Sequence, residues 1–463
     1  MNRIPKIALL LILFLSAIPL QAQKPWTLQE CIQYALDNNL NIKQQALAVA
    51  QDRNQLEQSK WAMAPNISAS ADYSFGWGRT PNAQDYTIVE NQLSQNGSLS
   101  MGASLDLFRG LQKVNTIKRN MAQLELSNQE VEKLKNDISM QITKLFLQVL
   151  LDQEILETTK QSHQSVKEQV ERTQKLVEAG NLAHSSLLEI EAQFATEQVQ
   201  VVNAENALRT DYLNLIQLLD LSYEADFRIE IPVFQVDTLN FLGAHVDQLF
   251  NTSQNLPQIQ IGEYTLQQRE YQFAVSKGQR FPSIALSAGV RTSYNPDYQV
   301  LKNMNLSPDL ENPVPMEPQY RSPALFEQLD SRKNPYIGIS FSIPILSGRT
   351  ISTNIRNASL GVQQAQIEMK NRQQELYKSI QQENNAAISA FERYKATLQN
   401  VKSMEESFRN VQQKFDVGML SGTDYTVAKT NLFRAQSDNL QAKYQYVLQL
   451  KILDFYKGIP ITL

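Results

Sequence analysis

Apolar and polar residues alternate without interruption from Asn66 to Thr80, in the stretch NISASADYSFGWGRT. The apolar positions are Ile67, Ala69, Ala71, Tyr73, Phe75 and Trp77, and the positions between them carry Asn, Ser, Asp or Gly. Successive side chains of a β-strand point to opposite faces, so this pattern predicts a strand with one apolar face and one polar face.

Three further stretches carry the same alternation: Ser98–Phe108, Ser283–Tyr294 and Tyr336–Ile345. Together with the first, they place four predicted strands within residues 66–108 and 283–345. Each has about the length that crosses a bilayer as a tilted strand, roughly 9–11 residues. A small soluble sheet that is buried on one face would show the same alternation, so the pattern alone leaves both alternatives open.

A different period follows each pair of predicted strands. After Gly110, apolar residues recur at intervals dominated by three and four positions, at Val114, Ile117, Met121, Leu124, Val131, Ile138, Ile142, Leu145 and Val149. A looser version runs through Ile355, Val362, Met369, Leu376 and Ile380. This heptad pattern predicts long helices that form coiled coils, and about 70 continuous helical residues would span roughly 105 Å.

The strand-to-helix junctions and the ends of the predicted long helices occur twice in the chain. LDLFRGLQ at 105–112 has a counterpart in IPILSGRT at 343–350, and VEAGNLAHSSLLEIEAQF at 177–194 has one in FDVGMLSGTDYTVAKTNL at 415–432. The glycines of these motifs lie 70 residues apart in both copies, from Gly110 to Gly180 and from Gly348 to Gly418. We therefore predict an internal two-fold repeat, with copies at about 24–220 and about 240–458.

The second copy has extra residues between its strands, and they are rich in proline. Asn295–Pro335 holds seven prolines, at positions 296, 308, 313, 315, 318, 323 and 335. This density of proline predicts an extended loop rather than a helix or a paired strand.

The first 22 residues have the layout of a secretory signal peptide. Arg3 and Lys6 precede the apolar run Ile7–Leu20, and the small residue Ala22 follows it. An uncleaved membrane anchor is the alternative, but the run is short for a spanning helix, and no later segment has the apolar length of one. Export from the cytoplasm, and the lack of an evident helical layer to cover the sheet, favour strands that lie in a membrane.

Composition weighs against several classes of function. A net charge of −4 does not favour a nucleic-acid partner. Cys31 is the only cysteine, which excludes an intramolecular disulfide, and its position inside a helical pattern argues against lipidation. His163, His184 and His245 are scattered and lack the spacing of a metal site. We find no convergent cluster of titratable residues, so we expect no catalytic, cofactor-binding or metal-binding residues and no enzyme activity.

The number of predicted strands requires more than one subunit. Four strands cannot close a transmembrane barrel, because the smallest known barrels have about eight. Open sheet edges do not persist in lipid, where unpaired backbone groups find no water. The chain is therefore expected to oligomerise, and the periodicity does not choose between two, three and four subunits.

The order, duplication and spacing of these features resemble the TolC-like outer-membrane efflux proteins over almost the whole mature chain. The resemblance includes WTLQECIQYALDNNLNI at 26–42, the doubled turns LFRG and ILSG, and LDFYKGIPITL at the C-terminus. It implies an α+β membrane protein in which residues 23–463 form a single protomer. Long coiled-coil hairpins would build a periplasmic α-barrel with an equatorial segment. Four strands per protomer would contribute to a 12-stranded β-barrel in the outer membrane.

The same resemblance implies a function and a set of partners. The protein would be a homotrimer embedded in outer-membrane lipid, with no cofactor. It would passively conduct substrates delivered by a periplasmic adaptor protein and an inner-membrane pump of the RND or ABC type. A surface-exposed structural coiled-coil protein or adhesin is the main alternative, and the doubled strand pairs argue against it. An exported enzyme is the third class.

Residues of a periplasmic gate are implied where this sequence matches the family pattern. An acidic residue six positions after the second-copy glycine helps to form the constriction, and here it is Asp424. The second acidic position holds Val427, and the equivalent first-copy positions hold Ser186 and Glu189, of which Glu189 supplies a charge. Asp424 also lies close to a helix start, so a capping role is an equal alternative and is compatible with gating.

Aromatic and turn residues complete the set implied by the family. Phe415 matches an aromatic position three residues before the second-copy glycine. The helical tips are Gly180, Asn181 and Leu182 in the first copy, and Gly418, Met419 and Leu420 in the second. Glycine suits a tight turn after a helix because it adopts the left-handed conformation without a Cβ clash. In the family, these tips face the adaptor.

Overall fold

The computed structural model describes residues 25–81, 87–222, 227–232, 243–303 and 319–462. The predicted signal peptide lies outside the described residues. The described chain is mostly helical and divides into two compact units. Of the described residues, we call those within 25–49, 127–262 and 368–462 the helical unit, and those within 50–126 and 263–367 the strand unit.

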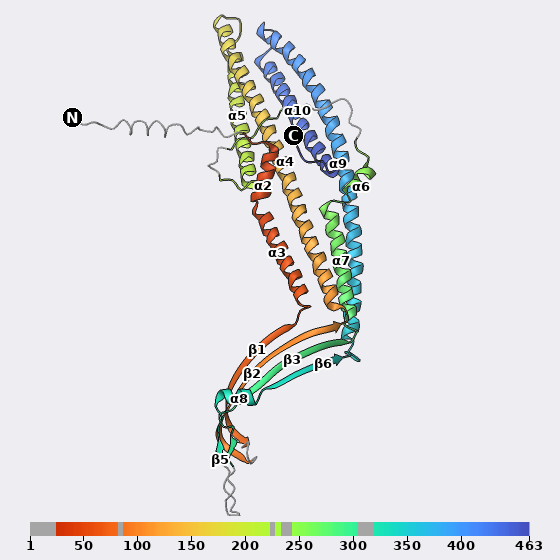
Figure 1. The fold of residues 1–463 in the computed structure, drawn as a ribbon. Coiled ribbons are helices and arrows are strands. Elements are labelled where there is room, and N and C mark those ends of the chain that lie inside the picture. Colours follow the sequence, from red (N-terminus) through yellow and green to blue (C-terminus); the bar gives the residue numbers. More distant parts are fainter. Residues whose placement is uncertain (1–24, 82–86, 223–226, 233–242, 304–318, 463) are drawn as a thin grey trace, which may run out of the picture. The chain divides into compact units, whose positions relative to one another are not determined.

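The strand unit contains an antiparallel sheet with the order β1-β2-β3-β6 (Figure 1). Its strands are β1 (Asn66–Pro81), β2 (Ile88–Arg109), β3 (Ser283–Tyr294) and β6 (Asn334–Ser342). All four predicted strands are present, and the two of the first copy extend beyond the predicted ends. β6 stops at Ser342, three residues earlier than predicted. Within the described residues, β1 and β6 form the sheet edges, because each pairs with one neighbour only.

The register gathers the apolar positions of all four strands on one face. Ala69 lies opposite Met101, Met101 opposite Val290, and the same alternation runs through Ile337 and Ile339 on β6. Many of these side chains are exposed in the single chain, and Ile337 retains 77% of its accessible surface. The other face is rich in serine: Ser68, Ser70, Ser98, Ser100, Ser104, Ser287 and Ser340.

The expected extended loop at 295–335 is wrong in part, because the segment contains paired strands and a helix. β4 (Val300–Asn303) pairs with β5 (Gln319–Arg321), and α8 (Leu325–Ser331) follows. Gln328 of α8 is fully buried, accepts a hydrogen bond from the Asn295 N–H at 3.0 Å and donates one to the Pro323 carbonyl at 2.9 Å. Pro323 lies outside α8 and leaves its hydrogen bonds intact.

A second proline of this segment, Pro335, lies within the sheet. It lies on β6 opposite Val290 of β3. Pro335 is the second residue of β6, and a proline close to the start of a strand removes a ladder hydrogen bond where the strand tolerates the loss best.

Two pairs of helices have matching lengths and form the main evidence for the repeat. α4 (Gln112–Glu178) and α9 (Thr350–Asp416) both have 67 residues, and α5 (His184–Leu218) and α10 (Gly422–Tyr456) both have 35. At about 1.5 Å per residue, each 67-residue helix is roughly 100 Å long. We call α4 with α5 hairpin one, and α9 with α10 hairpin two.

Shorter helices complete the fold: α2 (Leu28–Asn38), α3 (Leu40–Trp61), α6 (Val246–Ser253) and α7 (Pro257–Gly278). The first of them begins with a capping box, in which Thr27 and Glu30 bond reciprocally through side chain and backbone. None of the helices in the described ranges combines the length and apolar character needed to cross a membrane.

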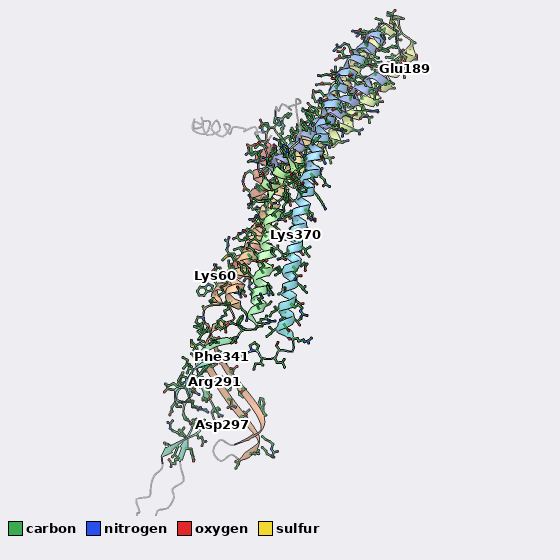
Figure 2. All side chains as sticks on the ribbon, turned by 90° about the vertical axis from the view of Figure 1, so that its right-hand side faces the viewer. Lys60, Glu189, Arg291, Asp297, Phe341 and Lys370 are labelled. Carbon is green, nitrogen blue, oxygen red and sulfur yellow. The ribbon has the colours of Figure 1, made fainter. Side chains whose placement is uncertain are left out.

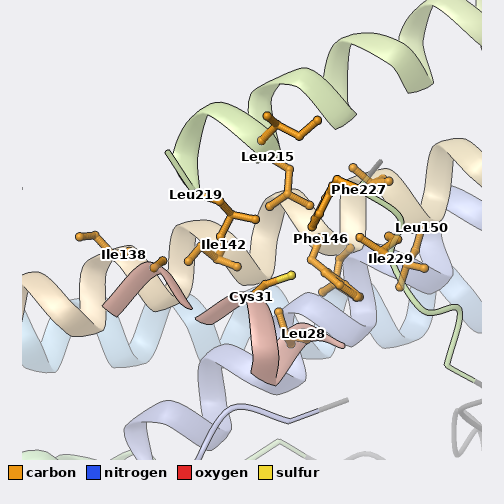
Figure 3. Packing of buried hydrophobic residues seen from close by; sticks show 14 of the residues in the cluster. Leu28, Cys31, Ile138, Ile142, Phe146, Leu150, Leu215, Leu219, Phe227 and Ile229 are labelled. Carbon is orange, nitrogen blue, oxygen red and sulfur yellow. The ribbon is translucent and has the colours of Figure 1, made fainter. Parts of the chain in front are cut away.

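The largest core of the helical unit joins α2 to hairpin one (Figure 3). Cys31 of α2 is fully buried against this cluster, whose labelled members in Figure 3 include Phe146 of α4 and Leu215 of α5. Burial raises the pKa of the Cys31 thiol to about 12, so the thiol stays protonated and unreactive near neutral pH. Cys31 is therefore a packing residue.

Candidate functional site at the helical turns

Each hairpin turns through a glycine with a left-handed backbone. Gly180 has φ +77° and Gly418 has φ +74°. The Gly180 N–H donates to the Val177 carbonyl at 2.9 Å, and the Gly418 N–H donates to the Phe415 carbonyl at the same distance. These bonds satisfy carbonyls at the helix ends, and a glycine takes this conformation at no steric cost.

The turns of the two hairpins lie side by side. A Cβ placed on Gly418 would come within 3.7 Å of the Leu182 side chain and 3.8 Å of the Asn181 carbonyl oxygen. One turn further along, a Cβ on Gly422 would meet the Glu189 carboxylate at 2.6 Å and the Ser186 carbonyl oxygen at 3.3 Å. The equivalent ends of the two repeat copies therefore pack directly against each other.

Asp424 caps the start of α10. Its carboxylate accepts hydrogen bonds from the Ser421 hydroxyl at 2.7 Å and the Ser421 N–H at 3.1 Å, and its own N–H donates to the Ser421 hydroxyl at 3.2 Å. The bonds from Ser421 lower the pKa of Asp424 below its usual value, so the carboxylate is charged at neutral pH. The side chain is exposed, and the capping role is thus seen directly.

Glu189, which is labelled at the end of the helical hairpins in Figure 2, brings a second carboxylate to the same helix start. The residue is half-buried, and its Oε2 atom has no hydrogen-bond partner within the described part of the chain. Because Gly422 is the first residue of α10, the carboxylate lies near the positive end of the helix dipole. Ser186 contributes its carbonyl oxygen to this contact, and Val427 is exposed at 54%.

Phe415 lies in the core beneath the turns. It is fully buried, and its ring packs 5.2 Å from the ring of Tyr425. The surrounding cluster contains Val166, Ile190, Phe408 and Leu432. In the single chain, Phe415 therefore supports the position of α10 from inside.

Several charged side chains near this core, some of them buried, were not predicted. Lys429 and Glu197 are 8% and 4% exposed, and Asp416 forms an ion pair of 3.1 Å with Arg172. Burial, with smaller contributions from Asp416 and Glu197, raises the pKa of Tyr425 to about 12. These residues come from all four helices of the two hairpins, and no sequence motif marks them.

The site offers charge and shape, but no convergent reactive groups. The described residues contain no group of three or more His, Cys, Asp or Glu side chains that could hold a metal ion. The two turn carboxylates are occupied with helix capping and packing. This arrangement supports one chemical role: the carboxylates at an exposed helix end can attract cations.

The sequence profile described as "Outer membrane efflux protein" matches residues 31–220 and 251–458, which is most of the chain. The chain belongs to the outer membrane efflux protein family. This confirms the family resemblance and assigns the protein to the outer membrane and to efflux or secretion.

Individual relatives are distant but cover most of the chain. "Alkaline protease secretion protein AprF" of Pseudomonas aeruginosa is 20% identical, over 84% of this chain and 76% of its own length. "Outer membrane protein TolC" of Vibrio cholerae is 21% identical, over 88% of this chain and 85% of its own length. The solved structure of CusC has a TM-score of 0.76 at 15% identity and covers 96% of both chains, so it shows the same fold.

Proposed function

We propose that the protein is the outer-membrane channel-tunnel of a tripartite export system. It forms a homotrimer and passively conducts substrates that a periplasmic adaptor and an inner-membrane RND or ABC pump deliver. Family membership supports an export role and disfavours the alternative of a structural coiled-coil protein or adhesin. The name of AprF refers to protease secretion, which supports protein cargo as one form of this export.

The observation that carries the proposal is the sheet of the strand unit. Its apolar face is exposed, its other face is rich in serine, and β1 and β6 each pair with one strand only among the described residues. In lipid, an open edge leaves backbone groups unsatisfied at a cost of several kcal/mol each. Joining β6 of one chain to β1 of the next removes both edges, and three chains give a closed barrel of twelve strands.

The helical hairpins supply the second part of the conduit. Each chain contributes α4, α5, α9 and α10, so three chains give a tunnel of twelve helices. The turns at Gly180–Leu182 and Gly418–Leu420 are the proposed adaptor-facing tips. Val417 and Met419 are 67% and 75% exposed in the single chain, and this pair of apolar side chains at the second turn supports contact with a partner there.

The periplasmic gate is proposed at the same end. Three copies of Asp424 around the trimer axis would form an acidic ring, with Glu189 in the position to supply the charge that Val427 lacks. Like charges in a narrow ring attract cations and disfavour anions. Ser186 and the buried Phe415 would shape the constriction by positioning α5 and α10.

Native mass spectrometry of the protein extracted from outer membranes in mild detergent tests the assembly. We expect a trimer of roughly 150 kDa, because closure of the barrel forbids a lone protomer. Heating in dodecyl sulfate should convert it to monomer and serves as the control for non-covalent assembly. A monomer as the main native species would contradict the proposal.

A further inference from the structure

Two adjacent apolar side chains protrude from the strand unit just after β6. β6 ends at Ser342 and α9 begins at Thr350, and Ile345 and Leu346 lie in the loop between them. They are 93% and 92% exposed, the highest values among the large apolar side chains of the described residues. We call residues 343–346 the β6 loop. An apolar pair this exposed indicates a surface that another molecule covers.

A second exposed apolar surface lies where α3 leads into β1. Trp61, Met63 and Ile67 are 74%, 47% and 63% exposed. The connection is a tight turn, in which the Ala64 N–H donates to the Trp61 carbonyl at 2.9 Å. We call residues 61–67 the β1 turn. Its bonded backbone holds these apolar side chains at the surface.

The two surfaces lie at the same end of the sheet but at opposite edges. Neighbouring strands are antiparallel in the order β1-β2-β3-β6, so β1 starts at the end of the sheet where β6 stops (Figure 1). Three strand spacings separate the two edges, which is roughly 14 Å. The β6 loop therefore does not cover the β1 turn of its own chain. Pairing of β6 with β1 of the next chain brings the two surfaces together.

The first repeat copy contains the same junction with a neighbour in place. Leu107 and Phe108 of β2 correspond to Ile345 and Leu346 in the alignment of LDLFRGLQ with IPILSGRT. They are only 53% and 38% exposed, and β2 is paired on both sides. Phe108 lies opposite Ile284 of β3. The junction of the second copy lacks such a neighbour, since β6 is an edge strand within the described residues.

The repeat holds position by position within the sheet. β1 and β3 each begin directly after a proline. Their first residues, Asn66 and Ser283, lie opposite Ser104 and Ser342. Ser104 and Ser342 directly precede the two aligned motifs, so both pairs are the same pair of the repeat. The register of one copy can therefore be carried over to the other.

We propose that the β6 loop of one chain docks on the β1 turn of the next chain. The partner is a second copy of this chain, because the pairing of Phe108 with Ile284 repeats at the seam as Leu346 opposite Ile67 of the next chain. The two surfaces differ, so the contact runs head to tail and is compatible with a closed ring. This inference rests on the trimer proposed above and adds a side-chain contact beyond the ladder between β6 and β1.

Crosslinking of a double-cysteine variant tests the contact in the full mature protein. Met63→Cys with Leu346→Cys, treated in isolated outer membranes with a short flexible bismaleimide, should give covalent dimers and trimers on denaturing gels. Met63→Cys with Ile88→Cys is the matched control. Ile88 is 63% exposed and lies at the far end of the sheet, opposite Pro81, so this variant should give monomer only. The buried Cys31 is present in both variants.

Native mass spectrometry of the same variants separates this inference from the proposed trimer. A native trimer with covalent dimers and trimers in the first variant supports the contact. A native trimer without these covalent species, or with equal amounts of them in both variants, overturns the contact and leaves the trimer standing. A native monomer of the unmodified protein overturns both.

Heat dissociation of the trimer in dodecyl sulfate decides between the next chain and lipid as the cover of these side chains. Leu346→Ser and Ile67→Ser should each lower the dissociation temperature, whereas Leu346→Met, which keeps an apolar side chain, should not. The double variant should shift the temperature by less than the sum of the single shifts, since both substitutions remove the same contact. Additive shifts, or no shift, would mean that the two side chains face lipid separately and would overturn the proposal.

Discussion

The carboxylate of Asp424 and the hydroxyl of Ser421 form a capping box at the start of α10, with a hydrogen bond of 2.7 Å between them. The carboxylate remains exposed while it makes these bonds. One side chain therefore fixes the helix start and carries a negative charge at the end of hairpin two. Capping and gating can be separated by substitutions that keep one property and remove the other.

Asp424→Asn should separate the two roles, because asparagine retains an acceptor oxygen and lacks the charge. We expect a melting temperature close to that of the unmodified protein, and a reduced cation preference in planar-bilayer recordings. Asp424→Ala should lower both the melting temperature and the cation preference, because alanine removes the acceptor oxygen as well as the charge. Adding Glu189→Gln to Asp424→Asn should reduce the preference further if Glu189 completes the ring.

Ser421→Ala is the matched control for this experiment. It removes the capping hydroxyl and keeps the charge, so it should cost about 1 kcal/mol of stability and leave ion selectivity unchanged. Unaltered selectivity in the double variant Asp424→Asn/Glu189→Gln would show that the acidic residues cap and pack without gating.

Gly422→Ala should loosen the contact between the two hairpins. The new Cβ would lie 2.6 Å from the Glu189 carboxylate and 3.1 Å from its Cβ, and overpacking of this kind costs about 1–3 kcal/mol. Adding Glu189→Ala removes the closest of these contacts and should restore part of the lost stability in thermal unfolding.

Gly361→Ala provides a control in a helix of the same kind. No atom lies within 4 Å of a Cβ at that position in the single chain, and alanine favours helix more than glycine does. We expect unchanged or increased stability. An equal loss in Gly361→Ala and Gly422→Ala would show that the contact with Glu189 is not the cause.

Local pattern was sufficient to predict the strands, the long helices and the capping alternative for Asp424. The alternation from Asn66 to Thr80 specifies a strand because one face is apolar throughout, and the register then follows from that face. The spacing between the junction glycine and the turn glycine is the same in both copies, and α4 and α9 accordingly have equal lengths. These features depend on residues close in sequence.

Features that depend on contacts between distant segments could not be predicted. α8 forms in a proline-rich segment because Gln328 reaches Asn295 and Pro323, and its sequence alone gives no such signal. Glu189 meets Gly422 only after the two hairpins pack. Lys429 occupies a buried position although a lysine in a polar-rich helix normally predicts an exposed face.

The two strand-to-helix glycines should tolerate alanine to different degrees. Both have a left-handed backbone, with φ +59° at Gly110 and φ +55° at Gly348. A Cβ on Gly110 would overlap the carbonyl oxygen of Gly278, whereas no atom lies within 4 Å of one on Gly348. Gly110→Ala should therefore prevent or strongly reduce trimer yield, and Gly348→Ala should cost about 1–2 kcal/mol for the backbone conformation alone. Equal yields of the two variants on heat-dissociation gels would contradict this reasoning.

The segment between β3 and β6 should lie outside the cell. Long loops of outer-membrane barrels face outward. The sequence suggests a second such loop around residues 82–95, but β2 already begins at Ile88, so the connection between β1 and β2 is shorter, and its residues 82–86 lie outside the described residues. An epitope tag inserted next to Pro315 should be detected by antibody on intact cells. A tag on the proposed periplasmic turn, next to Asn181, is the control and should be detected only after the outer membrane is opened. The reverse result would invert the strand directions.

The stability of the helical unit should depend on pH through Asp152 of α4. Its side chain is 7% exposed, its Oδ1 accepts a hydrogen bond from Gln148 at 3.1 Å, and its Oδ2 has no hydrogen-bond partner among the described residues. Burial and the neighbouring carboxyl of Asp211 raise the pKa of Asp152 to about 7. The folded protein therefore holds a proton there that the unfolded chain releases near its ordinary value of 3.8.

The sign of the effect follows from that difference. The stability contributed by the protonated Asp152 is complete below its unfolded pKa and is lost as pH rises through about 7, because the folded state must then ionise a buried carboxyl beside another. Asp152→Asn keeps an acceptor for Gln148 and cannot ionise. Between about pH 5.5 and about pH 8.5, the melting temperature of the unmodified protein should therefore fall more than that of Asp152→Asn. Asp211→Asn should also make the melting temperature fall less over this pH range, since it removes the charge that repels the Asp152 carboxylate. If the melting temperatures of the unmodified protein and of both variants change with pH in the same way, the carboxyl pair does not control stability.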